Sequence, residues 1–336
     1  MKPAPLRAVL AVPCLVLASA ALTGPAMGAS APPAAPPYAI AGPLREPRIF
    51  APDIVSTPDD EFGGSFSPDG ETVYFDKSVL RHYLYVILES HSAGGGWSAP
   101  SVAPFSGIYR DSDPVLSPDG SKLYFVSDRP VDGKPKTDYD IWVVTRTPGG
   151  WGEPRHLDPP INSEGNEFFA SAAANGDLYF TSDRPGGKGQ VDVYESRFVD
   201  GKYGAPENLG DAINSAGWES DCLVAPDGSY LLVATFGRPD SYGNYDLYVS
   251  YKRDGVWTPV KNLGPKINTP AREYSPRISP DGKYLFFTSE KDFATEPPQR
   301  PLTTEELERG LKSLQNGAGN IYQIDLSAAG VDAPPK

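Results

Sequence analysis

Five acidic residues recur along the chain, and each is followed eight positions later by Asp or Asn and then by Gly. They are Glu61, Asp111, Glu167, Glu219 and Glu273. Converging carboxylates could bind a cation or a basic peptide, and a pair of them could transfer protons in a hydrolysis. Each acid could instead pair with a base of its own repeat, because a paired carboxylate is far less costly to bury than a free one.

Basic residues at comparable places in the repeats are the expected partners in such a structural role. They are Arg129, Arg184, Arg238 and Lys291. We favour structural pairing for the five acids, and the alternative is that they serve as ligand-binding residues at one mouth of a channel. The choice depends on the elements that carry them.

Successive acids are separated by roughly 50 to 56 residues, which is typical of one blade of a β-propeller. In each repeat one strand runs from the acid to the Asp-Gly or Asn-Gly turn, and a run such as Leu123-Tyr124-Phe125 follows as the second strand. A third strand such as Ile141-Trp142-Val143 comes next, and a fourth opens at an aromatic residue such as Trp151. The sequence therefore predicts an all-β fold, a single five-bladed β-propeller of four-stranded blades over residues 48–326.

The fifth repeat has no fourth strand of its own, since the chain passes from Ile321 to Leu326 into Ala- and Pro-rich residues. Residues 49–55 have the pattern of an orphan fourth strand. We expect this N-terminal strand to pair with the last blade and close the ring, which removes the exposed edges of an open sheet.

Alternation along the first strand of each repeat separates a packed face from a channel face. Cys222 falls on the packed face, where a cysteine is usually an inert small hydrophobe. Asp113, Asp221 and Arg277 fall on the opposite face and are candidate channel residues. A channel filled only with water is the alternative.

An insertion at residues 292–318 interrupts the last repeat. Thr303 followed by Glu306 predicts a capping box at the start of a short helix. Leu307, Leu311 and Leu314 would share one face of this helix, and we expect them to dock on the propeller.

The N-terminal residues 1–31 combine Lys2 and Arg7, an apolar stretch and the small-residue site Ala29-Ser30-Ala31, which is the pattern of a secretory signal. The mature protein is therefore expected to be periplasmic or secreted, without a transmembrane span. Residues 32–47 and 327–336 are expected to be tails without a packed core.

The formal net charge of −13 disfavours binding to nucleic acid and to anionic membranes. A protein or carbohydrate partner is expected instead. Asp140, Asp192 and Asp246 each open a third strand and could ligate calcium, but capping of turns is the favoured role. No cofactor is expected, with calcium as the alternative, and the metal status stays open.

The turn sequences Ser67-Pro68-Asp69-Gly70, Ser117-Pro118-Asp119-Gly120 and Ser279-Pro280-Asp281-Gly282, with Leu-Tyr-Phe, Ser-Asp-Arg and Asp-Ile-Trp following the second of them, resemble the PD-type, WD-repeat-like propellers of TolB-like proteins. The resemblance covers residues 49–326. It implies an exported propeller that binds or scaffolds, and it implies no particular reaction.

Signals for catalysis are sparse. His82, His91 and His156 stand at unrelated positions of the repeat and give no metal-ligand spacing. The acids recur with the blade period, whereas a catalytic set should be unique to individual blades. We therefore expect a non-enzymatic binding or scaffold propeller that recognises a protein or glycan, with an extracellular glycan-cleaving hydrolase or lyase, built on carboxylates, as the alternative.

Overall fold

The computed structural model describes residues 1, 35–79, 82–293 and 299–332. The predicted signal at residues 1–31 therefore lies, apart from Met1, outside the described residues. From Pro36 onward the chain forms one compact unit. None of the helices in the described ranges is long and apolar enough to cross a membrane.

Five antiparallel sheets follow one another along the chain, and each is a blade of a β-propeller. The inner strands are β2 (Asp60–Phe66), β7 (Asp111–Leu116), β12 (Glu167–Ala172), β18 (Trp218–Val224) and β23 (Glu273–Ile278). The second strands are β3 (Thr72–Val79), β8 (Lys122–Ser127), β13 (Leu178–Ser182), β19 (Tyr230–Phe236) and β24 (Tyr284–Ser289). The third strands are β4 (Leu84–Ala93), β9 (Asp140–Thr147), β14 (Asp192–Ser196), β20 (Tyr245–Arg253) and β25 (Asn320–Asp325). The predicted five-bladed all-β fold is confirmed.

The outer strands are short and come after the aromatic residue that was expected to open them. They are β6 (Ser101–Val102), β11 (Arg155–His156), β17 (Glu207–Asn208), β22 (Lys261–Asn262) and β1 (Arg48–Ile49). In three blades the aromatic belongs instead to a strand that extends the third strand as a hairpin: β5 (Gly96–Trp97), β10 (Gly150–Trp151) and β21 (Val256–Trp257). In the third blade β15 (Phe198–Val199) and β16 (Lys202–Tyr203) form this hairpin.

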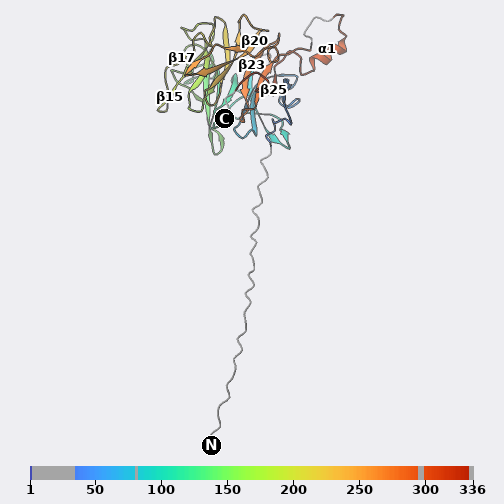
Figure 1. Ribbon diagram of the computed structural model, residues 1–336. Helices are drawn as coiled ribbons and strands as arrows, with labels where there is room; N and C mark the ends of the chain where they lie inside the picture. Colours follow the sequence, from blue (N-terminus) through green and yellow to red (C-terminus); the bar gives the residue numbers. More distant parts are fainter. Residues whose placement is uncertain (2–34, 80–81, 294–298, 333–336) are drawn as a thin grey trace. The chain divides into compact units, whose positions relative to one another are not determined.

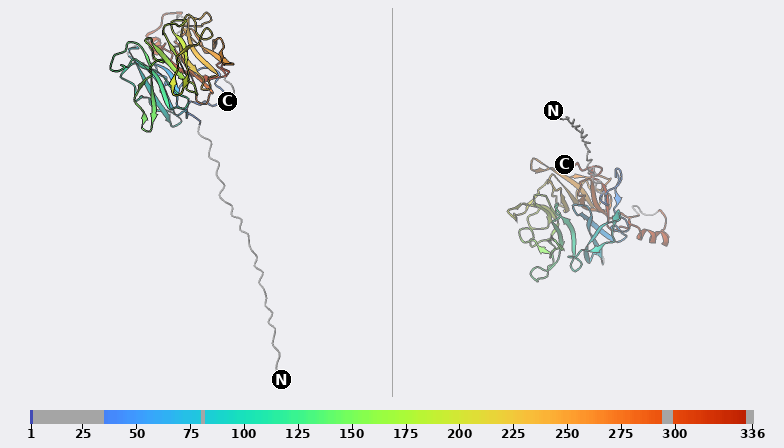
Figure 2. Two further views of the ribbon diagram at one scale, coloured as in Figure 1. Left: turned by 90° about the vertical axis from the view of Figure 1, so that its left-hand side faces the viewer. Right: turned by 90° about the horizontal axis from the view of Figure 1, so that it is seen from below.

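The ring is closed by β1, which pairs with β25 of the fifth blade as the sequence predicted. Beyond β1 the Phe50 N–H donates to the Ile321 carbonyl at 2.8 Å, and the Phe50 ring packs at 5.1 Å from that of Phe286. In the right-hand view of Figure 2 the colours run around the body from blue through green and yellow to orange, so the first and last strands meet. Closure thus supplies the fifth blade with its outer strand from the N-terminal part of the chain.

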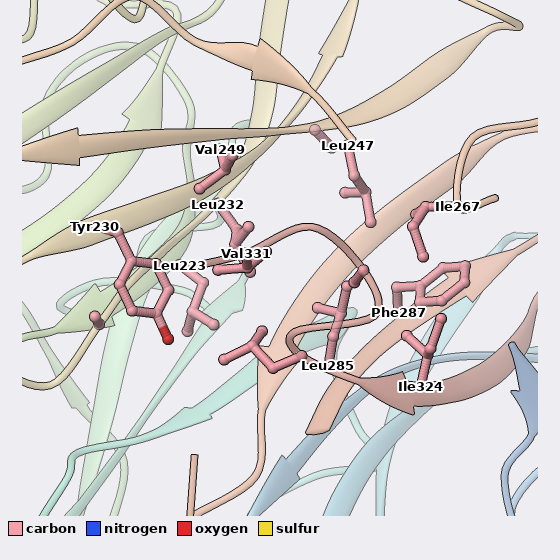
Figure 3. Close-up of a cluster of buried hydrophobic side chains, with 14 of the residues drawn as sticks. Leu223, Tyr230, Leu232, Leu247, Val249, Ile267, Leu285, Phe287, Ile324 and Val331 are labelled. Atoms are coloured by element: carbon pink, nitrogen blue, oxygen red, sulfur yellow. The ribbon is translucent and has the colours of Figure 1, made fainter. Parts of the chain in front are cut away.

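The core consists of hydrophobic clusters packed between the blades. Figure 3 shows the cluster between the fourth and fifth blades, where Leu232 and Leu247 face Leu285 and Phe287. All four side chains are at most 1% exposed. Burial of such a side chain stabilises a fold by about 1.5 to 3 kcal/mol. Cys222 is the one cysteine of the described ranges and is free, so the inter-blade clusters stabilise this part of the chain without a disulfide.

Both predicted tails contribute to this core, so the expectation that they lack packed residues is wrong. Tyr38 is 3% exposed and packs against Phe66 and Tyr284. Val331 is 2% exposed within the cluster of Figure 3. Single apolar residues in otherwise Pro- and Ala-rich segments can still anchor them by burying one side chain.

The insertion contains α1 (Thr304–Leu311), which begins at a capping box formed by Thr303 and Glu306. The expected docking of its leucines is wrong, since Leu307 and Leu311 are 44% and 57% exposed. The helix contacts Phe293 through Gly310, where a Cβ atom would lie 2.4 Å from that ring. Figures 1 and 2 show α1 at the margin of the propeller, away from the blades.

Candidate functional site

The five periodic acids are buried inside their own blades, with exposed fractions of at most 1%. In four blades the residue four positions earlier donates both its N–H and its hydroxyl to the carboxylate. At Glu167, for example, the Ser163 N–H lies 2.9 Å from Oε2 and the Ser163 hydroxyl 2.6 Å from Oε1. These contacts cap the loop that leads into the inner strand.

A base completes most of these arrangements. Arg129 lies 3.0 Å from Asp111, Arg184 lies 3.0 Å from Glu167, and Arg238 lies 3.0 Å from Glu219. In the first blade Lys77 of β3 contacts Glu61 at 3.0 Å, a partner that sequence reasoning missed. The ammonium of Lys291 lies 5.1 Å from the centre of the Tyr322 ring.

None of the five acids lines either cavity described below, so the geometry agrees with the favoured structural pairing and gives no support to the alternative role at a ligand-binding mouth. Burial raises the pKa of Asp111, Glu167, Glu219 and Glu273, and the hydrogen bonds just described oppose that rise. Their carboxylate oxygens are directed at loop amides and hydroxyls because an unpartnered buried charge would cost several kcal/mol.

Two cavities open along the axis of the propeller. One, of about 360 Å³, is lined where the inner strands begin, and we call it the strand-start cavity. The other, of about 590 Å³, is lined where the inner strands end in their Asp-Gly turns. Asp113 and Asp221 line the strand-start cavity, whereas Arg277 lines the turn-side cavity. The three predicted channel residues therefore lie between the two openings.

A fourth charged residue, Asp76 of β3, joins these three in what we call the central cluster. The Asp113 N–H donates to Asp76 Oδ2 at 3.0 Å. A Cβ atom at Gly63, which has a φ of +59°, would lie 3.2 Å from Asp76 Oδ2 and 3.6 Å from Arg277 Nη2. Glycine at this position thus lets Asp76 and Arg277 approach the inner strand of the first blade closely.

Arg277 and Asp221 are held by neighbouring blades. The Arg277 guanidinium donates to the Pro276 and Pro114 carbonyls at 3.0 and 3.2 Å and lies 4.1 Å from the centre of the Phe169 ring. Asp221 Oδ2 accepts from the Ser275 N–H at 2.6 Å and from the Ser275 hydroxyl at 3.1 Å. Residues of the second, third, fourth and fifth blades thus fix the geometry of the cluster.

Three carboxyls share one guanidinium in this cluster, so their charges cannot all be compensated. Burial and the neighbouring charge of Asp221 raise the pKa of Asp113 to about 7. Burial and Asp113 raise the pKa of Asp76 well above its usual range, and burial raises that of Asp221. Although the Asp113 and Asp221 side chains are partly accessible through the cavity, protein surrounds them on the other sides. A proton is therefore retained in the cluster near neutral pH.

The backbone at the cluster is unusual for a strand. Every inner strand shifts register in its middle, as a β-bulge does. At this bulge Asp113, Phe169 and Ser275 have φ values of +56°, +45° and +48°. Such conformations are uncommon for non-glycine residues and often occur at functional sites.

Aromatic residues dominate the wall of the strand-start cavity. They are Phe62, Tyr85, Tyr139, Phe168, Trp218, Tyr245 and Tyr274. The cavity thus combines this aromatic wall with charged residues, namely Asp60, Arg272 and Glu290 in addition to Asp113 and Asp221. A concave aromatic wall with a few convergent polar groups is typical of a small-molecule site.

Sequence reasoning found Asp113, Asp221 and Arg277 from strand alternation but missed Asp76 and the aromatic wall. A signal for Asp76 existed, because Thr181 and Thr288 stand at its place in the third and fifth blades. The Thr288 hydroxyl accepts the Gly63 N–H at 3.1 Å, as Asp76 accepts that of Asp113. A neutral hydroxyl suffices for this contact, so the carboxyl departs from the structural pattern.

The acids that open the third strands cap loops. The Gly189 N–H donates to Asp192 at 3.0 Å, and the Tyr242 N–H donates to Asp246 at 2.7 Å. Asp140 contacts Lys136 and His156 at 2.8 and 3.0 Å. Across the described ranges, no group of three or more His, Cys, Asp and Glu side chains is arranged to hold a metal ion.

Comparison with known proteins gives weak likenesses. No family model matches the chain. A *Bacillus subtilis* (strain 168) protein described as the uncharacterized peptidase YuxL is 29% identical over 220 residues, which cover 55% of this chain and 31% of the peptidase. The chain thus spans about a third of the length of that relative.

Solved structures share the fold at low sequence identity. An α-L-arabinofuranosidase from *Lactobacillus brevis* is 14% identical with a TM-score of 0.46, covering 81% of this chain and 92% of its own. The GH62 α-L-arabinofuranosidase domain of *Coprinopsis cinerea* is 12% identical with a TM-score of 0.46, covering 84% and 98%. A puromycin-hydrolyzing peptidase of *Mycobacterium tuberculosis* is 15% identical with a TM-score of 0.39, covering 77% and 41%. These likenesses concern the propeller fold, and the proteins are not specifically TolB-like.

The expectation of a non-enzymatic binding or scaffold propeller is contradicted. The Bacillus subtilis relative with which this chain shares sequence is described as a peptidase, and the likeness to the solved structures concerns the fold alone. The premise of that expectation was that the acids recur with the blade period. The central cluster departs from that period, since Asp113 and Asp221 stand at one repeat position that holds Gly, Phe or Ser in the other three blades, and Asp76 stands where the other blades have no acid.

Proposed function

We propose that the protein is an exported hydrolase that cleaves a glycosidic bond, with Asp113 as general acid and Asp221 as nucleophile or general base. The observation that carries the proposal is the pair of carboxyls that line the strand-start cavity, Asp113 from the second blade and Asp221 from the fourth, at a position where the other three blades have no acid. Glycoside hydrolysis requires two carboxyl groups of unlike protonation and no other catalytic side chain.

The surroundings of the two carboxyls support different protonation states. Asp113, with a pKa raised to about 7, retains a proton that it can donate to the departing glycosidic oxygen. Two hydrogen bonds from Ser275 to Asp221 Oδ2 favour the ionised carboxylate, which can attack the anomeric carbon or take a proton from water.

Asp76 and Arg277 act as positioning residues in this scheme. Asp76 is fully buried and does not line the strand-start cavity, and it holds the Asp113 backbone through one hydrogen bond. The Arg277 guanidinium faces the carboxyls from the turn side and lowers the energy of their ionised forms. Neither residue needs to contact the substrate.

A glycan suits the site better than a peptide does. His82 lines the cavity, but its Nδ1 faces both Ser78 Oγ at 2.9 Å and Asp60 Oδ2 at 3.5 Å. A serine nucleophile requires the imidazole to contact serine and carboxylate through different nitrogens. The residues that line this cavity therefore do not form the serine–histidine–carboxylate arrangement of a serine peptidase, although the relative is described as a peptidase.

The N-terminal pattern, the net charge and the turn sequences also support the proposal. The secretory pattern of residues 1–31 supports a substrate outside the cytoplasm, and the net charge of −13 favours a neutral or cationic glycan over an anionic one. The Ser-Pro-Asp-Gly turns support descent from a TolB-like propeller whose channel has acquired carboxyls.

The test is a screen of purified protein against aryl glycosides and soluble polysaccharides, measuring released phenol and reducing sugar. We expect one substrate class to be cleaved by the parent and by Asp211→Asn, a control whose side chain is 90% exposed. The Asp113→Asn, Asp221→Asn double variant should retain its fold and lose the activity. Absence of any cleavage above the level of the double variant would refute the proposal.

A further inference from the structure

Three aromatic side chains stand opposite one another across the fourth blade, at the edge where its inner strand begins. Trp218 of β18 pairs with Phe236 of β19, and Phe236 pairs with Tyr245 of β20. Residues directly opposite on antiparallel strands project to the same face of the sheet. The rings of Phe236 and Tyr245 are 5.5 Å apart, so the three residues form what we call the aromatic row.

The same positions of the inner and second strands are polar in the other blades. They hold the hydrogen-bonded pairs Arg110–Asp128 at 2.8 Å, Asn166–Asp183 at 2.7 Å and Arg272–Glu290 at 3.0 Å. In the first blade Asp60 stands opposite Ser78. The repeat therefore does not need aromatic residues here to fold, and the aromatic row belongs to the fourth blade alone.

The aromatic row is open to solvent and continuous with the strand-start cavity. Trp218 and Phe236 are 37% and 42% exposed, and Trp218 and Tyr245 line the cavity. The other four tryptophans of the chain are less exposed than Trp218. Exposed apolar surface that adjoins a cavity and has no packing role is typical of a binding surface.

We infer that the aromatic row is a sugar-binding platform that holds the glycan unit next to the one in the cavity. This inference rests on the proposed glycan hydrolase function and names the substrate as an oligosaccharide or polysaccharide. A sugar ring presents C–H groups on its face and hydroxyls on its edge, so it can stack on the row while its edge stays hydrated.

The polar pairs around the rim favour a glycan over an apolar peptide or a lipid. An apolar partner broad enough to cover the mouth would remove Arg110–Asp128 and Arg272–Glu290 from water, at a cost that it could not offset with hydrogen bonds. Sugar hydroxyls can donate to Asp128 and Glu290 and accept from the two arginines. The rim thus matches the alternating apolar and polar surface of a glycan chain.

Binding is tested separately from cleavage in the Asp113→Asn, Asp221→Asn double variant. Oligosaccharides of two to six units from neutral polysaccharides are titrated while tryptophan fluorescence is recorded. We expect a change that Trp218→Phe abolishes, and a loss of affinity of about tenfold on Phe236→Ala that Phe236→Tyr restores. Tyr83→Ala, a 76% exposed aromatic outside the row, serves as the matched control.

In the active protein, Phe236→Ala should raise KM for an oligosaccharide about tenfold and leave kcat/KM for a small aryl glycoside within twofold. An equal loss of kcat/KM on both substrates, or an unchanged affinity for oligosaccharides, would overturn the inferred sugar-binding role of the aromatic row. Neither result would contradict the proposed hydrolase function. Tight binding of apolar peptides or lipid vesicles in place of oligosaccharides would also overturn the sugar-binding role. Row-dependent binding without any cleavage would refute the hydrolase and support the platform.

Discussion

Two sets of carboxyls lie close together in this propeller and differ in what holds them. The periodic acids receive hydrogen bonds from their own loop, and Glu167 and Glu219, for example, also from an arginine of their own blade. The acids of the central cluster, Asp76, Asp113 and Asp221, share Arg277 with one another and accept from residues of other blades. One set is complete within a repeat, and the other exists only in the assembled ring.

The comparison shows that residues with a structural role and candidate catalytic residues follow different patterns in a repeat protein. An interaction that every blade repeats is needed for every blade to fold, so its charges are neutralised locally. A charge that only some blades carry is not neutralised within its repeat, and burial together with neighbouring carboxyls raises the pKa of Asp76 and Asp113. Departures from the period are therefore the better guide to function.

The largest expected effect is on catalysis. Asp221→Asn keeps the shape and the Ser275 contacts but removes the negative charge, and kcat on a cleaved glycan should fall about a thousandfold. Thermal melting should change little. If the variant kept more than a tenth of the parent activity, Asp221 would not be a catalytic residue. The central cluster would then no longer differ in role from the periodic acids.

The periodic set should show the opposite response. Arg184→Ala leaves the Glu167 carboxylate buried with one partner fewer, and we expect a loss of about 2 to 4 kcal/mol in the free energy of unfolding. The measurement is urea-induced unfolding, with the exposed Arg155→Ala as control. A loss below about 0.5 kcal/mol would mean that the arginine is dispensable for the blade.

The pH dependence of stability should distinguish the sets more finely. Because Asp113 has a pKa raised to about 7 in the folded protein, the native state binds more protons than the unfolded chain between about pH 4 and 7. Stability should therefore fall as the pH rises through this window. Asp113→Asn should reduce that fall by about 1 to 2 kcal/mol. Parallel stability profiles for parent and variant would contradict the raised pKa.

Calcium should have the smallest effect. Since the periodic acids are satisfied within their blades, added calcium should leave the melting temperature unchanged within about 1 °C. A clear increment that disappears in the Glu167→Gln, Glu219→Gln variant would show that these acids bind the ion. It would also overturn the division between the two sets.

Much of the architecture was determined by local sequence. The Asp-Gly turns, the apolar second strands and the aliphatic third strands are signals that act within a few residues, and five agreeing copies made the blade evident. The missing fourth strand of the last repeat implied closure by residues near Ile49, and β1 does pair with β25. Strand alternation likewise placed Asp113, Asp221 and Arg277 on the channel face.

Tertiary structure decided which of these charged residues meet. Whether Arg184 reaches Glu167, or Leu311 reaches the core, depends on distances between segments that no local pattern specifies. Asp76 lies beside Asp113 because the second strand of one blade packs against the inner strand of the next. The aromatic row exists because three strands align Trp218, Phe236 and Tyr245 in register. Hydrophobic periodicity specifies a blade, but only closure of the ring brings unlike blades together around one axis, and that is where charges without local partners are concentrated.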